Sequence, residues 1–258
     1  MAADAEDRSA HALPPAMDSA DSAQGASSTA SSELSPLAQA VSASQAEDHP
    51  KVVELLEPFL KTRVSRQDKA AARHLLGRSL VAVGRHEAAI KVLKQALAGA
   101  RNRHWHLADH LRWWLAQAQE GAERDLEASR TYGLITRDKH SELGMEAMWR
   151  RALCLERAKR TGSARRVLEG FLETFPEGPL AWTVQARLGK ILSDIGQTSE
   201  AIRLFRRVLR YVPRSEAAKV ASAELERLAA KGIAAARLDS MSVRVDDLEW
   251  LVSERRFV

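Results

Sequence analysis

The sequence has one cysteine, few aromatic residues and little glycine or proline. Cys154 is the only cysteine among 258 residues, which excludes an intrachain disulfide and leaves cysteine usage silent about the redox compartment. Aromatic residues make up 5% of the chain, with 13 glycines and 8 prolines. β-Branched residues are sparse, whereas alanine, leucine, arginine and glutamate dominate. This balance favours helix along the whole chain.

Long hydrophobic runs are lacking as well. No stretch approaches the roughly 18 apolar residues of a membrane-spanning helix. Residues 1–33 are rich in alanine, serine and aspartate, and they lack the apolar centre of a signal peptide. We expect this segment to be a disordered tail. The protein is then expected in the cytoplasm, unless its true start precedes this sequence.

Signatures of enzyme chemistry are missing too. The sequence has no nucleophile elbow, phosphate-binding loop, dinucleotide fingerprint or zinc-ligand spacing. Its many carboxylates stand at helix-surface spacing, so no pair can be singled out as catalytic. The sequence therefore predicts a protein that is not an enzyme, with no catalytic residue, no metal site and no cofactor.

Charge is divided unevenly along the chain. Residues 1–50 carry eight acidic groups and one basic group, Arg8, whereas the whole chain has a net charge of +5. The part after residue 50 is therefore basic, which favours an anionic partner. Nucleic acid is not favoured, because no arginine–glycine run or zinc-finger spacing is present. Basic residues gather at 150–166 and 203–210, either as solvated outer helix faces or as a surface for an anionic partner.

An internal repeat is the strongest signal in the sequence. Its clearest copy is "AWTVQARLGKILSDIGQTSEAIRLFRRVLRYVP", residues 181–213, and a second copy is "AAARHLLGRSLVAVGRHEAAIKVLKQALAGA". Two further copies and a degenerate first copy share a small residue in the first of two predicted helices. These small residues, here called the marker residues, follow one another at intervals of 37, 39, 36 and 37: Ala40, Gly77, Ala116, Ala152 and Gly189.

The repeat has a physical explanation. Each copy predicts a helical hairpin that cannot bury its apolar stripe alone and must stack on its neighbours. The marker residue and an alanine of the second helix let the two helices approach closely, and a large residue four positions after that alanine fills the seam. Proline ends the second helix, as at Pro176 and Pro213. The predicted fold is all-α, an α-solenoid of helical hairpins.

These motifs resemble the tetratricopeptide repeat over about residues 36–213. Both "LGRSLVAVGRHEAAIKVLKQAL" and "LGKILSDIGQTSEAIRLFRRVLRYVP" match its leucine-glycine, glycine, alanine and aromatic-or-leucine positions. The predicted organisation is a tail at 1–33, a repeat array at 34–231, and a linker with an incomplete hairpin at 232–258. The amphipathic stretch 215–231 either caps the array or begins another unit. Because the chain stops where a partner helix would begin, we expect a fragment of a longer protein.

The stretch "HWHLADHLRWWLAQA", residues 104–118, predicts a first helix of the repeat. Leu111, Trp114 and Leu115 share one helical face and are expected in the core. Trp113 falls on a second face with His106, His110 and Gln117. The resemblance implies that this face lines a concave groove. Candidate ligand-binding residues, taken from this face in each unit, are His74, Arg78, His106, His110, Trp113, Gln117, Trp149, Glu156 and Lys190.

Three hypotheses concern this groove. His106 and His110 are four residues apart and could share a metal ion with Asp109, the alternative being two solvated histidines. Trp113 and Trp149 could stack on a sugar or a peptide, or else pack against the next repeat. A carboxylate clamp, which some tetratricopeptide domains use, needs groove asparagines. It is set aside because the only asparagine lies outside the groove.

A narrower resemblance concerns three segments, "LADHLRWWLAQAQ", "FLETFPEGPLAWTVQARLG" and "VLRYVPRSEAAKVASAELERLAAKG". They look like the helical superhelix of bacterial soluble lytic transglycosylases, which act on periplasmic peptidoglycan. The catalytic motifs of that family do not occur in this sequence, so no catalytic residue is carried over. The resemblance implies a non-catalytic superhelical part, a periplasmic location and an anionic cell-wall glycan as partner.

The leading functional prediction is therefore a non-catalytic binding or scaffold module, with a protein, a peptide or a wall glycan as its partner. The alternative is a stand-alone adaptor that assembles other proteins in the bacterial envelope or the cytoplasm. Nucleic acid is not an expected partner, and the oligomeric state stays open.

Overall fold

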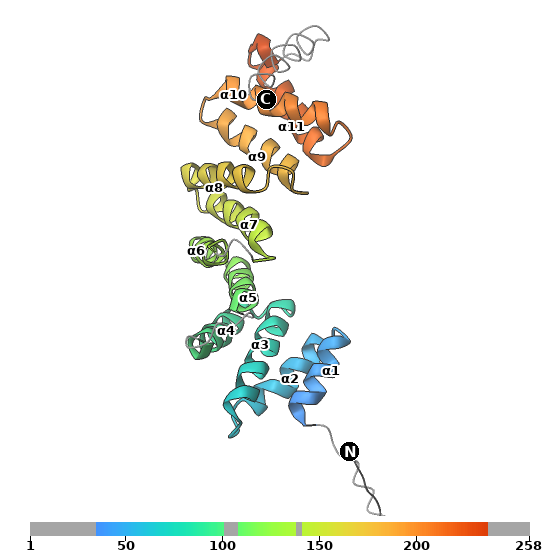
Figure 1. The fold of residues 1–258 in the computed structure, drawn as a ribbon, viewed down its shortest axis with the longest axis vertical. Helices are drawn as coiled ribbons and strands as arrows, with labels where there is room; N and C mark the ends of the chain where they lie inside the picture. Colours follow the sequence, from blue (N-terminus) through green and yellow to red (C-terminus); the bar gives the residue numbers. More distant parts are fainter. Residues whose placement is uncertain (1–34, 101–107, 138–140, 237–258) are drawn as a thin grey trace, which may run out of the picture. The chain divides into compact units, whose positions relative to one another are not determined.

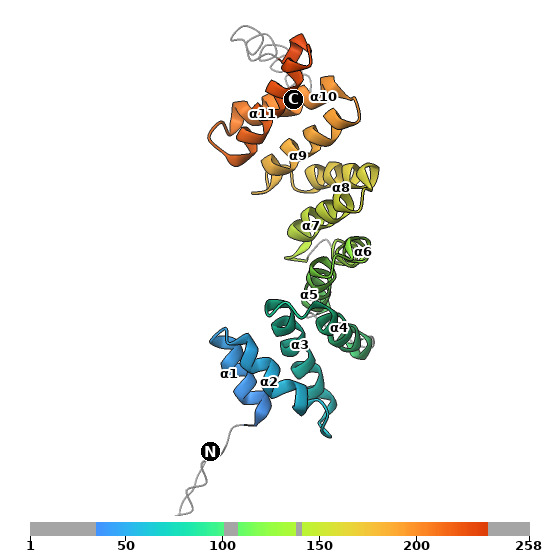
Figure 2. The ribbon, with the colours of Figure 1, turned by 180° about the vertical axis from the view of Figure 1, so that it is seen from behind.

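The computed structural model describes residues 35–100, 108–137 and 141–236. Every regular element in these ranges is helical, as predicted, and Figures 1 and 2 show the helices in chain order from two opposite sides. Their bounds are α1 Pro36–Gln45, α2 His49–Phe59, α3 Arg66–Ala82, α4 His86–Ala100, α5 Ala108–Gly121, α6 Asp125–Ile135, α7 Gly144–Arg157, α8 Thr161–Thr174, α9 Ala181–Asp194, α10 Thr198–Tyr211, α11 Glu216–Ala230 and the 3₁₀-helix η1 Ala234–Ala236.

The helices form five hairpins, here called units 1 to 5, from α1/α2 to α9/α10. Each helix packs on the one before it and the one after it, so the apolar stripe of every hairpin is covered by its neighbours. First helices also pack across units, α1 on α3, α3 on α5 and α9 on α11. The predicted α-solenoid of helical hairpins is thereby confirmed.

The marker residues lie in the seams of the hairpins, as predicted. Ala40, Ala116 and Ala152 are fully buried. A Cβ atom on Gly77 would collide with Cδ2 of Leu93, and one on Gly189 would lie 2.7 Å from Cε1 of Phe205. Both approaches are too close for real contacts. Glycine is therefore the residue that lets a large second-helix side chain fill these two seams.

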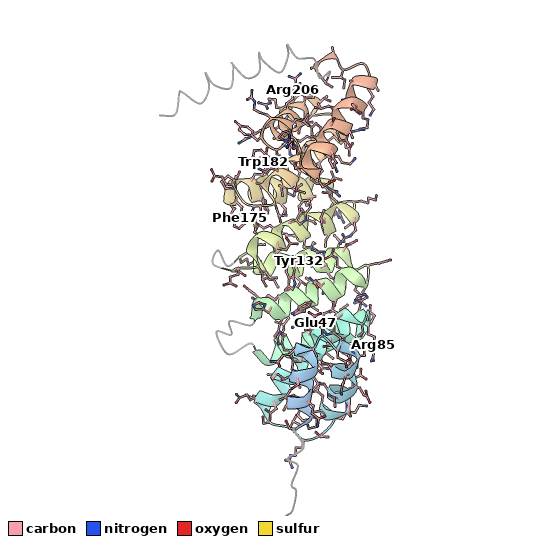
Figure 3. All side chains as sticks on the ribbon, turned by 90° about the vertical axis from the view of Figure 1, so that its right-hand side faces the viewer. Glu47, Arg85, Tyr132, Phe175, Trp182 and Arg206 are labelled. Carbon is pink, nitrogen blue, oxygen red and sulfur yellow. The ribbon has the colours of Figure 1, made fainter. Side chains whose placement is uncertain are left out.

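The turn inside each hairpin uses one repeated backbone device. The residue seven positions after each marker has a positive φ of 57° to 85°. The amide of the next residue donates to a carbonyl five residues back, as Gln197 does to Leu192 at 2.8 Å. This hydrogen bond is the Schellman closure of a helix. Figure 3 labels two residues of these turns, Glu47 and Arg85, and the positive-φ residues are Glu47, Gly84, Glu123, Lys159 and Gly196.

Three of these turns carry a side chain where glycine is preferred, which leads to a stability prediction. We expect Glu123→Gly and Lys159→Gly each to raise the free energy of unfolding by about 0.5–1 kcal/mol, because glycine adopts a positive φ without steric cost. Both side chains are exposed. The reverse change, Gly196→Ala, should lower it by about 1 kcal/mol. Urea unfolding measures all three, and a destabilised Lys159→Gly would contradict the argument.

Helix α11 occupies the place of a first helix in a sixth unit. It packs on α9 and α10, just as α5 packs on α3 and α4. It also ends in the same turn, with Gly232 at φ +84° and the Ile233 amide donating to the Leu228 carbonyl at 3.2 Å. Of the two alternatives for this stretch, the geometry favours the start of another unit.

The predicted tail at 1–33 and most of the predicted linker at 232–258 lie outside the described residues. Among the described helices, none is both long enough and apolar enough to cross a membrane.

Candidate functional site: the first-helix face

The first helices α3, α5, α7, α9 and α11 present one surface on which side chains of successive units meet. We call this surface the first-helix face. In α3, α5, α7 and α9, the side chains that make these contacts stand two residues before the marker, or one, four or five residues after it.

Glu120, four residues after its marker, is the centre of the contact between units 3 and 4. Its carboxylate accepts a hydrogen bond from the Tyr132 hydroxyl at 2.9 Å and lies 2.7 Å from Nη2 of Arg157. Arg150 of α7 lies 3.6 Å away, and Arg157 also pairs with Asp125 at 2.8 Å. Only 13% of the Glu120 side chain is exposed. This charge is therefore neutralised where it is largely shielded from water.

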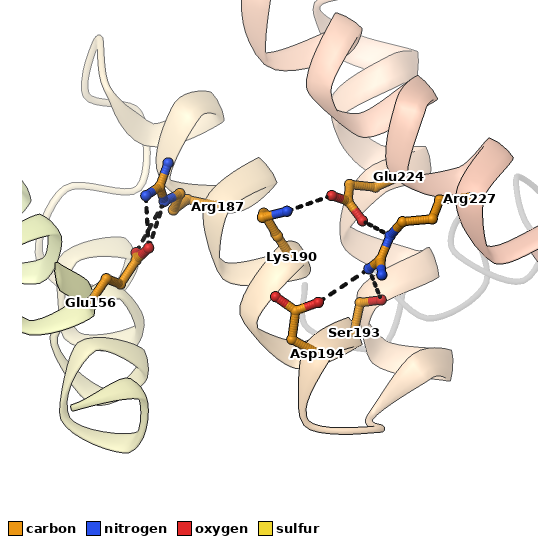
Figure 4. Close-up of polar contacts among 7 residues, drawn as sticks. All are labelled: Glu156, Arg187, Lys190, Ser193, Asp194, Glu224 and Arg227. Atoms are coloured by element: carbon orange, nitrogen blue, oxygen red, sulfur yellow. Dashed lines mark hydrogen bonds and ion pairs between the residues drawn. The ribbon is translucent and has the colours of Figure 1, made fainter. Parts of the chain in front are cut away.

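The same arrangement continues toward the C-terminal end (Figure 4). Glu156 of α7, four residues after its marker, accepts two hydrogen bonds from Nε of Arg187 in α9, at 2.9 and 3.0 Å. Lys190 of α9 donates to Glu224 of α11 at 2.8 Å, and Arg227 holds the other Glu224 oxygen at 2.7 Å. Ion pairs thus join α5 to α7, α7 to α9 and α9 to α11.

Between units 2 and 3 the contact is a cation over an aromatic ring. The Arg78 guanidinium of α3 lies 5.6 Å from the ring centre of Trp114 in α5. Trp114 is partly buried and packs against the apolar core of units 1 to 3, at the edge of the predicted core face. Its neighbour Trp113 packs edge-on against Tyr132 of its own hairpin, with ring centres 5.5 Å apart. Trp149 likewise packs against the core of units 4 to 6 and is partly buried.

His74 of α3 and His110 of α5 lie close enough for the charge of one to affect the other. His110 is exposed, whereas His74 is partly buried and its Nε2 atom has no hydrogen-bond partner in the described part of the chain. Burial lowers the pKa of His74, and His110 and Arg78 lower it further. His106, the other histidine of the metal hypothesis, lies outside the described residues. Among those described, no group of three metal-ligating side chains comes together.

The His74 environment gives a pH prediction. Its pKa is below 6.5 in the folded chain, so the unfolded chain binds the proton more readily. The stability that neutral His74 contributes is therefore fully present above about pH 6.5, the ordinary pKa of histidine. It is lost as the pH falls from there through the lower pKa of the folded chain. We expect urea unfolding midpoints to fall between about pH 7 and pH 5, and to fall less in His74→Gln than in the wild type. His110→Gln should reduce the slope less than His74→Gln does, because His110 only adds to the effect of burial on the His74 pKa. An equal slope in wild type and His74→Gln would contradict the assignment.

Burial and the ion pairs also shift other groups on this face. Burial raises the pKa of Cys154 to about 12, and the nearby Glu120 carboxylate adds to the shift. The thiol is therefore held protonated and unreactive. Burial and Glu120 together raise the pKa of Tyr132. For Glu224, burial acts to raise the pKa, but hydrogen bonds from Lys190 and Arg227 outweigh it and lower the pKa.

An open cleft of about 680 Å³ lies on this face around Glu120. The side chains of Arg150 and Arg157 remain 39% and 45% exposed in it, so each guanidinium keeps donors that face solvent. The walls combine both signs of charge with an amide and small apolar groups. The lining residues are Val81, Gln117, Glu120, Gly121, Glu123, Asp125, Arg150 and Arg157.

Of the predicted groove residues, Arg78, Glu156 and Lys190 make the contacts between units, and Gln117 lines the cleft. The sequence prediction did not include Glu120, Arg150, Arg187 and Glu224. A signal for them was present, because glutamate recurs four residues after a marker at Glu120 and Glu156, and arginine recurs two residues before the next marker. Whether any of these residues binds a ligand stays a prediction.

The hairpins, their seams and the face of first helices define a helical-repeat protein of the solenoid class. A family model described as "Tetratricopeptide repeat" matches residues 146–178, and a second with the same description matches residues 72–103 and 186–217. The chain is a tetratricopeptide-repeat protein. No curated protein sequence matches it.

Solved structures share this fold at low sequence identity. A Podosopora anserina protein, described as a kinesin light chain with nearly identical TPR-like repeats, is 21% identical, with a TM-score of 0.55 over 70% of this chain and 96% of that one. MamA AMB-1 is 15% identical, with a TM-score of 0.56 over 70% and 92%. The apo form of RapI is 11% identical, with a TM-score of 0.60 over 86% of this chain and 64% of that one. These similarities establish the fold alone.

Proposed function

We propose that this chain is a protein-binding scaffold that holds a segment of a partner protein against the first-helix face. The observation that carries the proposal is the cleft around Glu120, where Arg150 and Arg157 combine bonds to acidic side chains with solvent-facing donors. Stacked repeats present such a surface as a continuous strip, on which a partner segment can contact several units. The tetratricopeptide repeats support protein binding as the general role.

The experiment places a photo-crosslinking residue at Gln117, in the wall of the cleft, and at Gln95, an exposed site on α4 outside it. We expect a defined protein to crosslink from Gln117 and not from Gln95, and the crosslink to weaken when Arg157→Ser removes a guanidinium from the cleft. The captured protein, once purified, should bind the full chain with the same dependence on Arg157. Equal crosslinking from both sites would sink the proposal.

The lytic transglycosylase assignment is a narrower proposal, in which this chain is the superhelical part and works in the periplasm. It rests on the sequence resemblance alone. Binding of purified glycan strands, with Trp113→Ala and Trp149→Ala as variants, tests it, together with the coding sequence beyond Val258. If neither substitution changes the affinity for glycan strands, the hypothesis that a sugar stacks on Trp113 or Trp149 is ruled out. The adaptor alternative predicts a protein ligand and no glycan binding.

A further inference from the structure

The second helices carry a repeated feature that the proposed role of the first-helix face does not use. Fourteen residues after the marker, units 2 to 5 all have a cation: Lys91 in α4, Arg130 in α6, Arg166 in α8 and Arg203 in α10. All four are exposed. We call them the basic row. The corresponding residue of unit 1 is Glu54, also exposed, so the basic row begins at unit 2.

No acidic side chain in the described part of the chain forms an ion pair with the basic row. The contacts found for Arg166 are long ones within its own helix, to the Gly162 carbonyl at 3.4 Å and the Ser163 hydroxyl at 3.5 Å. Two of the nearby carboxylates pair with other cations, Glu87 with Arg124 and Glu169 with Arg165. On the first-helix face, cations pair with carboxylates of the same chain. The cations of the basic row are instead available to a partner molecule.

From this pattern we propose that the basic row binds an extended acidic segment of a partner protein. One repeat spans two helix packings of about 8–10 Å each, so successive cations lie within about 20 Å. An extended peptide covers about 3.3–3.6 Å per residue, so acidic residues up to about six positions apart reach successive cations. The periodic cation thus suits a linear acidic chain that runs across the second helices.

Two other polyanions fit this surface less well. Single-stranded nucleic acid is held by aromatic stacking as well as charge. The residues one turn before and after each cation of the row, Glu87 and Gln95 among them, include no aromatic in the described helices. A membrane surface favours apolar side chains that insert between lipids. Within one turn of the cations of the row, exposed large apolar residues occur on α6 alone among the described helices, at Leu126 and Leu134.

The test measures binding of fluorescent poly-L-glutamate to the full chain by anisotropy, with poly-L-glutamine as the uncharged control. The row variant is K91Q/R130Q/R166Q/R203Q. A matched variant removes four exposed cations elsewhere, K51Q/K61Q/R63Q/K231Q, so both lose the same charge. We expect poly-L-glutamate to bind the wild type. Its affinity for the row variant should be at least about tenfold lower, and its affinity for the matched variant should stay within about twofold of the wild-type value. Thermal melts confirm that both variants fold.

Three results would overturn the proposal. The first is no binding of poly-L-glutamate to the wild type, and the second is an equal loss in both variants, which would show a general effect of net charge. The third is tighter, row-dependent binding of oligo-dT or of phosphatidylserine vesicles, which would assign the basic row to another partner class. Crosslinking from Gln117 should not change in the row variant, so this proposal and the first-helix proposal can fail separately.

Discussion

Phe205→Ala should lower the free energy of unfolding by about 3–5 kcal/mol. The Phe205 ring is fully buried in the seam of unit 5, and the alanine would leave a cavity beside Gly189. The complementary change, Gly189→Ala, places a Cβ 2.7 Å from the same ring. Overpacking costs about 1–3 kcal/mol, and the higher helix propensity of alanine offsets about 1 kcal/mol of that cost. We therefore expect Gly189→Ala to lower the free energy of unfolding by less than Phe205→Ala does. Chemical unfolding measures both changes.

A double variant and a control make this prediction specific. Gly189→Ala with Phe205→Leu installs alanine and leucine, the residues that occupy the corresponding positions of unit 4 as Ala152 and Leu168. The double variant should therefore lose less than the sum of its two single changes. Gly99→Ala is the control, because in the described part of the chain its new Cβ would meet no atom within 4 Å beyond its own helix backbone, and it should stabilise α4. If Gly189→Ala stabilised the chain equally, the tight seam would be refuted.

The second large effect is expected at Glu120. Glu120→Ala removes the carboxylate that holds the Tyr132 hydroxyl and Arg157, and it leaves partly buried donors without their acceptor. Breaking a buried ion pair costs about 3–5 kcal/mol. Because 45% of the Arg157 side chain is exposed, solvent screening lowers our expectation to about 2 kcal/mol. Denaturant unfolding is the measurement, and the loss should be smaller in high salt.

The comparison for Glu120 is an exposed pair in the same chain. Glu216 and Lys219 lie 2.6 Å apart with side chains 87% and 71% exposed, so Glu216→Ala should have little effect. A double-mutant cycle of Glu120→Ala with Tyr132→Phe isolates the hydroxyl–carboxylate contact. A Glu120→Ala variant as stable as Glu216→Ala would mean that the contact between units 3 and 4 rests on apolar packing alone.

The positions of the hairpins could be predicted from the sequence because each hairpin depends on the spacing of a few residues within its own repeat. A small marker residue, an alanine twelve positions later and a large residue four positions after that define a hairpin seam without knowledge of the neighbouring units. All five seams are confirmed, including the degenerate first one, where Val52 replaces the alanine and Ala40, Val52 and Leu56 are fully buried.

The contacts between units could not be predicted in the same way. Adjacent residues on a helix point about 100° apart, so whether Trp113 or Trp114 faces the next unit depends on the angle at which hairpins stack. That angle comes from the summed packing of several helices, and no local pattern contains it. The recurring glutamate and arginine positions were visible, but pairing Glu120 with Arg157 needs the register between α5 and α7.

The ion pairs between first helices have a mechanical consequence. Stretching the array along its length separates neighbouring first helices, and on the first-helix face this pulls on partly exposed charge pairs such as Glu156 with Arg187. Salt weakens such pairs but not the apolar seams. We therefore expect the resistance of this side of the array to stretching to fall as the ionic strength rises, and a partner that adds a charge there to change that resistance as well as occupying the surface.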